Sequence, residues 1–524
     1  MTRPAPALTR HAPNGMVCSI DHLASAAGID VMRGGGNAVD AAITTNAVLA
    51  VTSQHMCGLG GDLFALVHLD DGPPVVLNAS GRAGSGADPQ QLRAEGMTAM
   101  PFKGDIRSTT MPGCVDGWGA LHMRFGSVPL VDLLAPAVNL ARAGFPASPT
   151  LAHSIPGILD VEGADDYQRD GGVSTGDRIV REGVARTLEA IGREGRDGFY
   201  GGEFGEGLLE VGGGLFTADD LATSQADWVE PTGVRAYGHD IWTVPPNSQG
   251  YLGLAGTWIT DGLDLPDDPS DPLWAHYLVE SARQAGFDRP QVLHDRADGQ
   301  ELVSPGRLAP RRAAIDPDRA SALPAPARGG GTMYMCAAMS DGTGISLIQS
   351  NASGFGVHLA VPGPRIFLHN RGLGFSIEEG HPAEFLPGRR PPHTLAPALV
   401  TRTDGSLRSV LGTMGGDTQP QIVSQMLVRL LRHDQTPGQI LAAPRAALAP
   451  DRPSGFDSWV DPSVLGVEIE DHGLDDWQAG LEARGHDVGS VPPGIGHAHL
   501  IDLDGETLAG AADPRARTGA ASGF

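Results

Sequence analysis

The chain has 524 residues, of which 41% are hydrophobic, and its formal net charge at pH 7 is −25. Its size and hydrophobic content indicate a globular protein with one large core or two fused ones. The acidic balance argues against nucleic acid or an anionic membrane as the main partner, since both need basic patches. The four cysteines stand far apart with no Cys/His cluster, so we expect no metal and no cofactor.

The start of the chain lacks the features of a targeting segment. Residues 1–15 include Pro, Arg and His but no apolar core, so we expect no secretory signal here. No stretch reaches the ~18 apolar residues that a membrane span needs. We therefore expect a cytoplasmic protein that does not contact a membrane.

The predicted elements begin with two helices separated by glycines. Small and apolar residues in Leu23–Val31 indicate the first helix, and three glycines at 34–36 end it. Asn37 is suited to cap the next helix. Its apolar residues lie on nearly all sides and are Ala38, Val39, Ala41, Ala42, Ile43, Ala47 and Val48. We therefore expect this second helix to be buried.

A strand pair and a long mixed region follow. Leu63–Leu69 and Val75–Leu77 flank the Asp-Asp-Gly-Pro-Pro segment 70–74, which predicts a hairpin. In the middle of the chain helical stretches alternate with loops, and Val131–Ala143 and Pro272–Ala285 are the clearer helices.

Two segments of this middle region are predicted to be irregular. Residues 244–250, with the sequence Val-Pro-Pro-Asn-Ser-Gln-Gly, indicate a rigid loop rather than a strand. Residues 313–331 are rich in Ala, Pro, Arg and Gly, which indicates an exposed linker and a natural place for a chain break.

Short strands dominate after the linker. Met333–Met339 and Ile345–Ile348 flank a Ser-Asp-Gly-Thr-Gly turn, which predicts a second hairpin. Another strand, Leu407–Leu411, leads through glycines into a helix over about 419–432, whose apolar residues lie on one stripe. Residues 500–508 predict a last hairpin.

A threonine stands where the linker meets the first of these strands. Thr332 follows three glycines, and a cut of the Gly331–Thr332 bond would give it a free α-amino group. That group, with a reference pKa near ~8, can act as the general base for the threonine's own hydroxyl, as in threonine hydrolases. The alternative is that Thr332 merely begins a strand after a linker.

Gly415 and Gly416 offer two successive backbone amides at a strand-to-helix turn. Such amides can converge on one oxygen as an oxyanion hole, in which one lost donor costs ~10²–10³ in rate. Glycine pairs at these turns are also often only steric necessities. Gly58–Asp62 is glycine-rich too, but it precedes a strand rather than a helix, which favours close backbone packing over phosphate binding.

Further polar groups stand near these candidates in the sequence. Ser350 lies one strand beyond Thr332, so a hairpin would bring its hydroxyl back toward the threonine. The alternative is that Ser350 is only a polar residue at the end of a strand. Arg389 and Arg390 are suited to meet an anionic substrate or to form a solvated loop.

Taken in this order, the motifs resemble those of the γ-glutamyltransferase family of N-terminal nucleophile hydrolases. The resemblance runs from about Gly15 to Arg515 and is thin only in parts of the middle. The segments that carry it are GGNAVDAA at 35–42, GLGGD at 58–62, PGCVD at 112–116, PPNSQG at 245–250, Thr332 nine residues before Asp341-Gly342, NRG at 370–372, MGGD at 414–417 and ADPR at 512–515.

This resemblance implies a fold and a processing event. The fold is of the α+β class, a four-layer αββα sandwich, made as one precursor that cuts itself between Gly331 and Thr332. The pieces 1–331 and 332–524 would stay together as one αβ heterodimer, which could dimerise further, because the central sheets take strands from both.

The resemblance also implies a role for each candidate residue. Thr332 attacks the carbonyl of a small-molecule amide and forms an acyl-enzyme, and water or an acceptor amine then releases the acyl group. Gly415 and Gly416 hold the oxyanion, and Ser350 supplies the hydroxyl that the family places near the nucleophile's amine.

The substrate-binding positions depart from the γ-glutamyl pattern. Ser80 stands where those enzymes have an arginine for the substrate α-carboxylate, and Ala352 stands where they have an amide. Leu373-Gly374 replaces the acidic pair that holds the α-amino group, and His393-Thr394 replaces a serine pair. Because each charge-assisted bond contributes ~1.5–3 kcal/mol, glutathione is not expected as the natural substrate.

The segments 78–82 and 370–372 look more like the acylase-like and oxamate-amidohydrolase-like branch of the family. We therefore expect an acyl group that carries a carboxylate but no α-amino group. The residues expected to bind it are Arg82, Arg371, His393 and Thr394.

Three alternatives remain open from the sequence. The protein could be a true γ-glutamyl hydrolase or transferase that acts on glutathione through other residues. It could be an unprocessed, non-catalytic relative, although the presence of Thr332, Ser350, Gly415 and Gly416 argues against this. It could also use the fold in a biosynthetic pathway to cleave an unusual bond, such as C–C.

Overall fold

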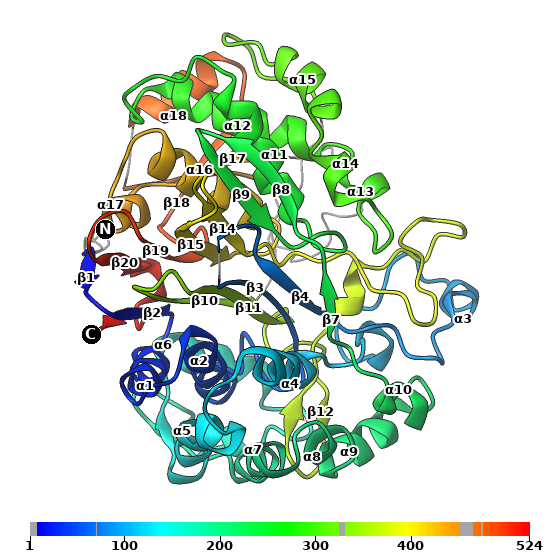
Figure 1. Cartoon of the computed structure of the whole chain (residues 1–524). Helices are drawn as coiled ribbons and strands as arrows, with labels where there is room; N and C mark the ends of the chain where they lie inside the picture. The colour runs from blue at the N-terminus through cyan, green and yellow to red at the C-terminus, as the bar shows by residue number, and fades with distance from the viewer. Residues whose placement is uncertain (1–7, 70, 324–330, 451–464, 473–474) are drawn as a thin grey trace.

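The computed structural model describes residues 8–69, 71–323, 331–450, 465–472 and 475–524. Two seven-stranded sheets lie face to face at the centre, and helices cover the outer face of each (Figure 1). This arrangement is the four-layer αββα sandwich that the resemblance implies.

Neighbouring strands in both sheets are antiparallel, and each sheet mixes strands from before and after residue 331. The first sheet has the order β1 (Arg10–Ala12), β20 (Leu508–Ala512), β19 (His497–Asp502), β15 (Leu407–Met414), β14 (Ala398–Thr401), β9 (His239–Thr243) and β8 (Thr232–Ala236). The second sheet has the order β21 (Ala520–Gly523), β2 (Gly15–Ser19), β10 (Gly331–Met339), β11 (Gly344–Ala352), β3 (Asp62–His68), β4 (Val75–Ala79) and β7 (Asp227–Val229).

The outer layers consist of helices that pack on the two sheets and of further helices that pack on these (Figure 1). The layer on the second sheet contains α1 (His22–Arg33), α2 (Ala38–Thr52), α4 (Cys114–Phe125), α5 (Leu130–Ala143) and α7 (Glu182–Glu194). The layer on the first sheet contains α11 (Gly250–Asp261), α12 (Pro272–Gly286) and α16 (Gln419–Leu431).

The remaining elements are short helices and three small sheets around this sandwich. The helices are α3 (Pro89–Ala94), α6 (Pro149–Ser154), α8 (Asp197–Tyr200), α9 (Glu203–Gly212), α10 (Ala218–Ala222), α13 (Arg289–Val292), α14 (Gly299–Leu302), α15 (Pro305–Ala313), α17 (Pro437–Ala442) and α18 (Asp475–Ala483). The small sheets pair β5 (Phe145–Pro146) with β6 (Arg178–Ile179), β12 (Ala360–Val361) with β13 (Ile366–Phe367), and β16 (Ala446–Pro450) with β17 (Leu465–Glu470) and β18 (Val488–Val491).

Helix α2 is the centre of the layer on the second sheet. Asn37 caps it by accepting hydrogen bonds from the amides of Val39 and Asp40, and the Asp40 carboxylate accepts from the Asn37 amide. All its residues from Ala38 to Thr52 are buried, which confirms the sequence prediction. A helix that is apolar on every side has no solvent face, so it can only lie inside the fold.

The strand that begins at the glycine-rich linker divides its side chains between two cores. Met333 and Met335 lie in the core between the second sheet and its helices. Tyr334 and Cys336 lie in the core between the two sheets. Because side chains alternate along a strand, Thr332 belongs to the inter-sheet face.

Most sequence-predicted elements are confirmed, including both early hairpin strands, α5, α12, the β10–β11 hairpin and α16. The middle of the chain, however, also contributes β7, β8 and β9, where the sequence pattern predicted helix and loop.

The hairpin near residues 500–508 is not the last strand pairing, because β21 follows it and pairs with β2. β21 reads Ala-Ala-Ser-Gly, which lacks the β-branched and aromatic residues typical of strands. Of the predicted linker, residues 324–330 lie outside the described residues, and Gly331 already belongs to β10.

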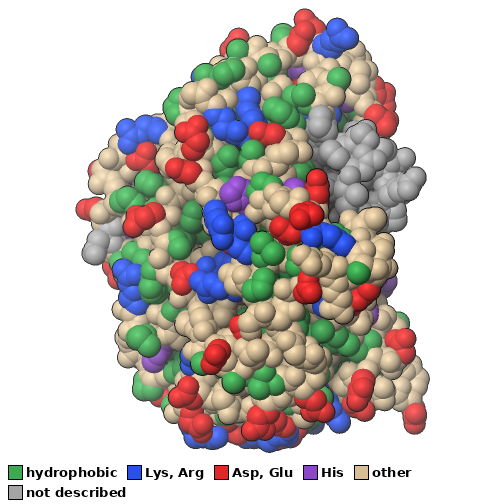
Figure 2. All heavy atoms as spheres, turned by 90° about the vertical axis from the view of Figure 1, so that its right-hand side faces the viewer, with side chains coloured by type: hydrophobic (Ala, Val, Ile, Leu, Met, Phe, Trp, Pro, Cys, Tyr) green, Lys and Arg blue, Asp and Glu red, His purple; other side chains and the backbone are tan. Residues whose placement is uncertain are grey.

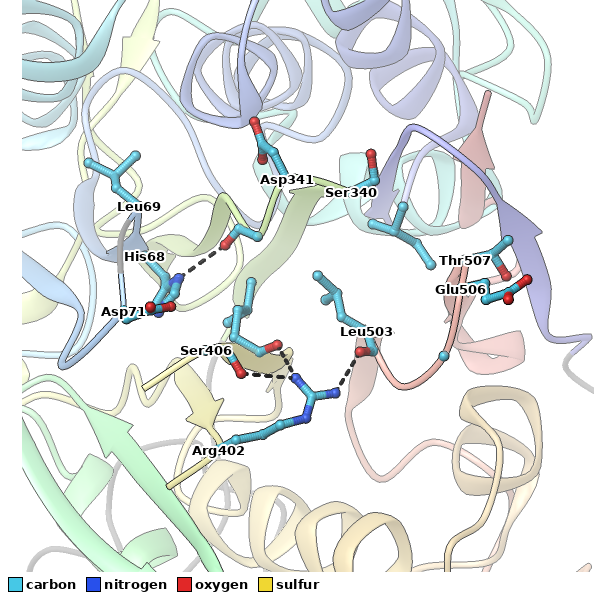
Figure 3. A pocket seen from close by; sticks show the side chains of 14 residues that line it. His68, Leu69, Asp71, Ser340, Asp341, Arg402, Ser406, Leu503, Glu506 and Thr507 are labelled. Atoms are coloured by element: carbon cyan, nitrogen blue, oxygen red, sulfur yellow. Dashed lines mark hydrogen bonds between the residues drawn. The ribbon is translucent and has the colours of Figure 1, made fainter. Parts of the chain in front are cut away.

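The end of the sandwich away from Thr332 is closed by hairpin turns of both sheets. A pocket of about 280 Å³ lies among these turns (Figure 3). The His68 ring bridges two of them, because its ring nitrogens lie 3.0 Å from the carbonyl oxygens of Gly342 and Gly405. Arg402 donates to the carbonyl oxygens of Leu407 and Leu503 at 2.7 Å. The His68 contacts connect the two sheets at this end, and the Arg402 bonds join neighbouring strand ends of the first sheet.

The surface carries both charge signs. On the face shown in Figure 2, basic and acidic side chains are interspersed over the described residues. Among the described helices, none combines the length and apolar character needed to cross a membrane.

Several histidines are buried where protonation is costly. Burial lowers the pKa to about 3 in His55, His486 and His499, and to about 4 in His393 and His497. These groups are therefore neutral in the folded protein at pH values where the unfolded chain binds protons on them.

We expect the free energy of unfolding to decrease as the pH falls from 6.5 toward 4. The unfolded chain takes up protons that the folded protein excludes, and each fully linked histidine gives a slope of about 1.4 kcal/mol per pH unit. Denaturant unfolding between pH 7.5 and 4.5 measures this slope. His499→Met, which removes one buried imidazole, should flatten it, whereas His22→Gln at an exposed position should not. Stability that is constant from pH 7 to 5 would contradict the expectation.

Candidate active site

Thr332 lies at the start of β10, opposite Ser350 of β11. Both residues are fully buried, and their hydroxyl oxygens are 3.1 Å apart. The β10–β11 register places these two residues as partners, with an irregularity between Gly331 and Thr332. The chain is continuous here, so the Thr332 nitrogen is an amide in this structure. The hairpin thus brings Ser350 to Thr332, as predicted.

Asp62, the first residue of β3, extends this row by one strand. Its partner in the β11–β3 register is Ser350. Thr332, Ser350 and Asp62 therefore occupy neighbouring positions across three strands of the second sheet. Sequence reasoning gave the Gly58–Asp62 segment a packing role only and missed this carboxylate.

The Asp62 carboxylate is completely buried and binds two side chains through one oxygen. Asp62 Oδ2 lies 2.9 Å from Arg371 Nε and 2.6 Å from His393 Nε2. His393 and Arg371 hold the pKa of Asp62 well below its usual range despite its burial, which by itself would raise it. Asp62 Oδ1 has no hydrogen-bond partner among the described residues.

Arg371 connects this carboxylate to two hydroxyl groups. It is only 1% exposed, and it donates from one terminal nitrogen to Ser350 Oγ at 2.8 Å and from the other to Thr394 Oγ1 at 3.0 Å. The guanidinium group thus bonds Asp62, Ser350 and Thr394 at once. Its planar fork is suited to such fixed directions.

His393 is neutral in this arrangement. Its Nδ1 accepts a hydrogen bond from the Leu395 amide at 3.2 Å, which leaves the ring proton on Nε2 for Asp62. Burial and the nearby Arg371 charge lower the pKa of His393 to about 4, in agreement with a neutral ring.

Gly415 and Gly416 form the turn between β15 and α16. Their φ angles are 141° and 56°, in the region that favours glycine. A Cβ atom on Gly415 would lie 2.7 Å from Thr418 Oγ1. The turn therefore requires glycine for steric reasons, and its use as an oxyanion hole stays a prediction.

The proline-rich loop at 245–250 joins this turn to the rest of the site. Gln249 Nε2 donates to the carbonyl oxygen of Thr394 at 2.9 Å and to that of Gly416 at 3.0 Å. Ser248 pairs with His393 in an isolated β-bridge. Residues 244–249 form a loop, as predicted, whereas Gly250 begins α11. The loop also contacts the second sheet, because Asn247 Oδ1 accepts a hydrogen bond from Asn78 Nδ2 of β4 at 3.1 Å.

One predicted substrate-binding residue lies outside this network. Arg82 binds the Asp227 carboxylate at 2.5 Å, and Arg390 binds the same carboxylate at 2.6 Å.

The neighbouring arginine of Arg390 is also paired, because Arg389 binds Asp295 at 2.5 Å. Arg389 and Arg390 are therefore largely buried in ion pairs, which corrects the expectation of a solvated loop.

The structure thus gathers most of the predicted site residues into one set of hydrogen bonds. The set consists of Thr332, Ser350, Arg371, His393, Thr394 and Gly416. The residues that sequence reasoning missed are Asp62 and Gln249. Two features of the sequence could have indicated them: Asp62 is a carboxylate at the end of a glycine run, and Gln249 is an amide in a rigid loop.

Comparisons with known proteins agree with this architecture. A family model described as gamma-glutamyltranspeptidase matches residues 24–523. The chain is 33% identical to the glutathione hydrolase-like YwrD proenzyme of Bacillus subtilis, over 97% of this chain and 98% of that protein. It is 31% identical to the oxamate amidohydrolase proenzyme of Klebsiella pneumoniae, over 98% of each. Among solved structures, a cephalosporin acylase from Bacillus halodurans superposes with a TM-score of 0.90 at 30% identity, covering 100% of this chain and 98% of that one.

Gly61 provides a test of how tightly the backbone packs behind Ser350. A Cβ atom at Gly61 would lie 2.4 Å from the Ser350 carbonyl oxygen and 2.9 Å from Asn351 Oδ1. We expect Gly61→Ala to lower the free energy of unfolding by about 1–3 kcal/mol, because the end of β11 must shift. Denaturant unfolding measures this loss.

The matched control is Gly119→Ala. Gly119 lies in α4 with open space around its Cβ position, so alanine there should leave stability unchanged or raise it slightly. Equal stability of both variants would show that the packing at Gly61 does not matter.

Proposed function

The chain belongs to the gamma-glutamyltranspeptidase family, and we propose that it is an autoprocessed amide hydrolase whose nucleophile is Thr332. The observation that carries the proposal is the connection from Thr332 through Ser350 and Arg371 to Thr394, and through Gln249 to Gly416. Side-chain hydrogen bonds thus link the proposed nucleophile to the glycine turn of the two candidate oxyanion donors, although Gly415 lies 83 residues after Thr332 in the sequence.

The proposed first reaction is self-cleavage. Thr332 Oγ1 attacks the Gly331 carbonyl carbon, the C–N bond to Thr332 breaks, and water hydrolyses the resulting ester. The products are pieces of 331 residues and of 193 residues, since the chain has 524. Several relatives are named proenzymes, which supports such a step. The two pieces would remain one structural unit because both sheets contain strands from each.

The second reaction uses the amine that the cut releases. The α-amino group of Thr332 accepts the hydroxyl proton while Oγ1 attacks the amide carbonyl of the substrate. The amides of Gly415 and Gly416 stabilise the negative oxygen. The amine product leaves with the proton, and water or an acceptor amine then attacks the acyl-enzyme and restores Thr332.

The proposed substrate carries a carboxylate on its acyl group and no α-amino group. Neither Leu373 nor Gly374 can supply the carboxylates that would bind an ammonium group. Arg371 is a candidate for the substrate carboxylate, since its terminal nitrogens carry more N–H groups than its bonds to Ser350 and Thr394 use. Arg82, which is paired with Asp227, is the second candidate. The name oxamate amidohydrolase of one relative supports an acyl group of this class, because oxamate is an amide whose acyl part carries a carboxylate and no α-amino group.

We expect the purified protein to separate into two pieces on denaturing electrophoresis, the smaller beginning Thr-Met-Tyr-Met. Thr332→Ala should remain one chain and lose all hydrolysis, because it has no hydroxyl to attack with. Thr332→Ser, which keeps a hydroxyl, serves as the control and should still be cut. An unchanged chain that stays intact on long incubation would contradict the proposal.

We expect the enzyme to hydrolyse glutaryl or oxamate amides at least about tenfold faster than γ-glutamyl anilides, measured as kcat/KM. A tenfold preference corresponds to about 1.4 kcal/mol, close to one charge-assisted bond lost for the ammonium group. A clear preference for the γ-glutamyl compound would instead favour the alternative of a true γ-glutamyl hydrolase or transferase.

A further inference from the structure

We propose that Asp62 is a positioning residue for the reaction: it holds Arg371 so that Arg371 orients the Ser350 hydroxyl toward the nucleophile. The inference rests on the proposed function of Thr332. It concerns a carboxylate that the sequence motifs did not assign to the site, and one that lies 309 residues from Arg371 along the chain.

Arg371 and Asp62 neutralise each other's charge in the protein interior. Arg371 and Asp62 are 1% and 0% exposed, so neither charge is solvated by water. Among the described residues, Asp62 is the only carboxylate that bonds to Arg371. His393 is neutral, and His369 donates from Nε2 to the Thr110 carbonyl oxygen while its Nδ1 lies 3.7 Å from Asp62. The pair is thus electrically neutral, and removal of Asp62 leaves a buried cation, which is strongly unfavourable.

The position of the Ser350 oxygen follows from the bonds that it accepts. Ser350 Oγ accepts hydrogen bonds from Arg371 and from the Ala352 amide, both at 2.8 Å. These two bonds hold the Ser350 oxygen 3.1 Å from Thr332 Oγ1, and in the proposed role Ser350 donates its hydroxyl hydrogen to that oxygen. Such a donor stabilises negative charge that develops on Oγ1 as the threonine loses its proton.

Asp62 also joins the two sides of the site. It lies on β3 of the second sheet, and through His393 it contacts the segment that pairs with the proline-rich loop. The His393 amide donates to the Asn247 carbonyl oxygen and its carbonyl accepts from the Gln249 amide, both at 2.9 Å. Gln249 in turn holds Gly416. Asp62 therefore positions the nucleophile side relative to the proposed oxyanion side.

The test is Asp62→Asn, which preserves shape and removes the charge. We expect kcat to fall about tenfold to a hundredfold with a smaller change in KM, because an interaction with the developing alkoxide is weakened. The uncompensated Arg371 charge should also disfavour the ammonium form of the Thr332 amine. The acid limb of the kcat/KM profile, which reports that amine, should move to lower pH by about one unit.

A double variant separates charge from shape. Asp62→Asn with Arg371→Gln restores the net charge, so the acid limb should return to its original pH. The value of kcat should remain low, because Ser350 has lost the arginine donor. A role in packing alone would lower activity in both variants without moving the acid limb.

Asp502→Asn is the matched control. Asp502 forms a buried ion pair with Arg408 at 2.9 Å, near the end of the sheets away from Thr332. It should leave kcat and the acid limb unchanged even if it lowers stability. Thermal unfolding of each variant shows whether it is folded.

The outcomes distinguish this inference from the proposed function. The unchanged chain and Thr332→Ala are measured in the same series, and absence of cleavage and turnover in the unchanged chain would overturn the proposed function itself. If the unchanged chain is active, an Asp62→Asn variant with the original kcat and acid limb would overturn the role of Asp62. Equal changes of the profile in Asp62→Asn and Asp502→Asn would overturn that role as well.

Discussion

The antiparallel pairing of β10 with β11 is the constraint on which the rest of the site depends. It places Thr332 directly opposite Ser350, and the pairing of β11 with β3 adds Asp62 to the same row. Because side chains alternate, all three face the space between the two sheets. A one-residue slip in either pairing would turn these groups toward the helices and separate them.

Burial decides the electrostatics of this row. The Asp62–Arg371 pair has no access to solvent, so its charges are balanced internally, and His393 stays neutral. Neutral buried histidines recur in both sheets and their surroundings, as in His55, His497 and His499. The same burial that makes hydrogen bonds directional near Thr332 thus makes the fold sensitive to acid, since each of these rings must be charged in the unfolded chain at low pH.

The interlaced sheets explain how a cut beside the nucleophile is compatible with a stable fold. β10 lies between β2 and β11, and β11 lies between β10 and β3, so strands from the two proposed pieces pair directly. The inter-sheet core likewise combines Phe64 from one piece with Tyr334 from the other. A cut at Gly331–Thr332, as proposed, would break one covalent bond and none of these pairings.

The sequence by itself determined the elements whose causes are local. The Asn37 cap, the apolar α2 helix, the hairpin turns and the stripe of α16 all depend on residues within a few positions of one another. The family motifs added the fold, the candidate nucleophile and the glycine turn. Only the tertiary structure decided which polar groups meet. Asp62, 309 residues from Arg371, joined this hydrogen-bond network through strand register, whereas Arg82 lies outside the network in an ion pair with Asp227. Local patterns carry no information about such contacts, because they arise when distant strands are brought side by side and buried charges must find partners.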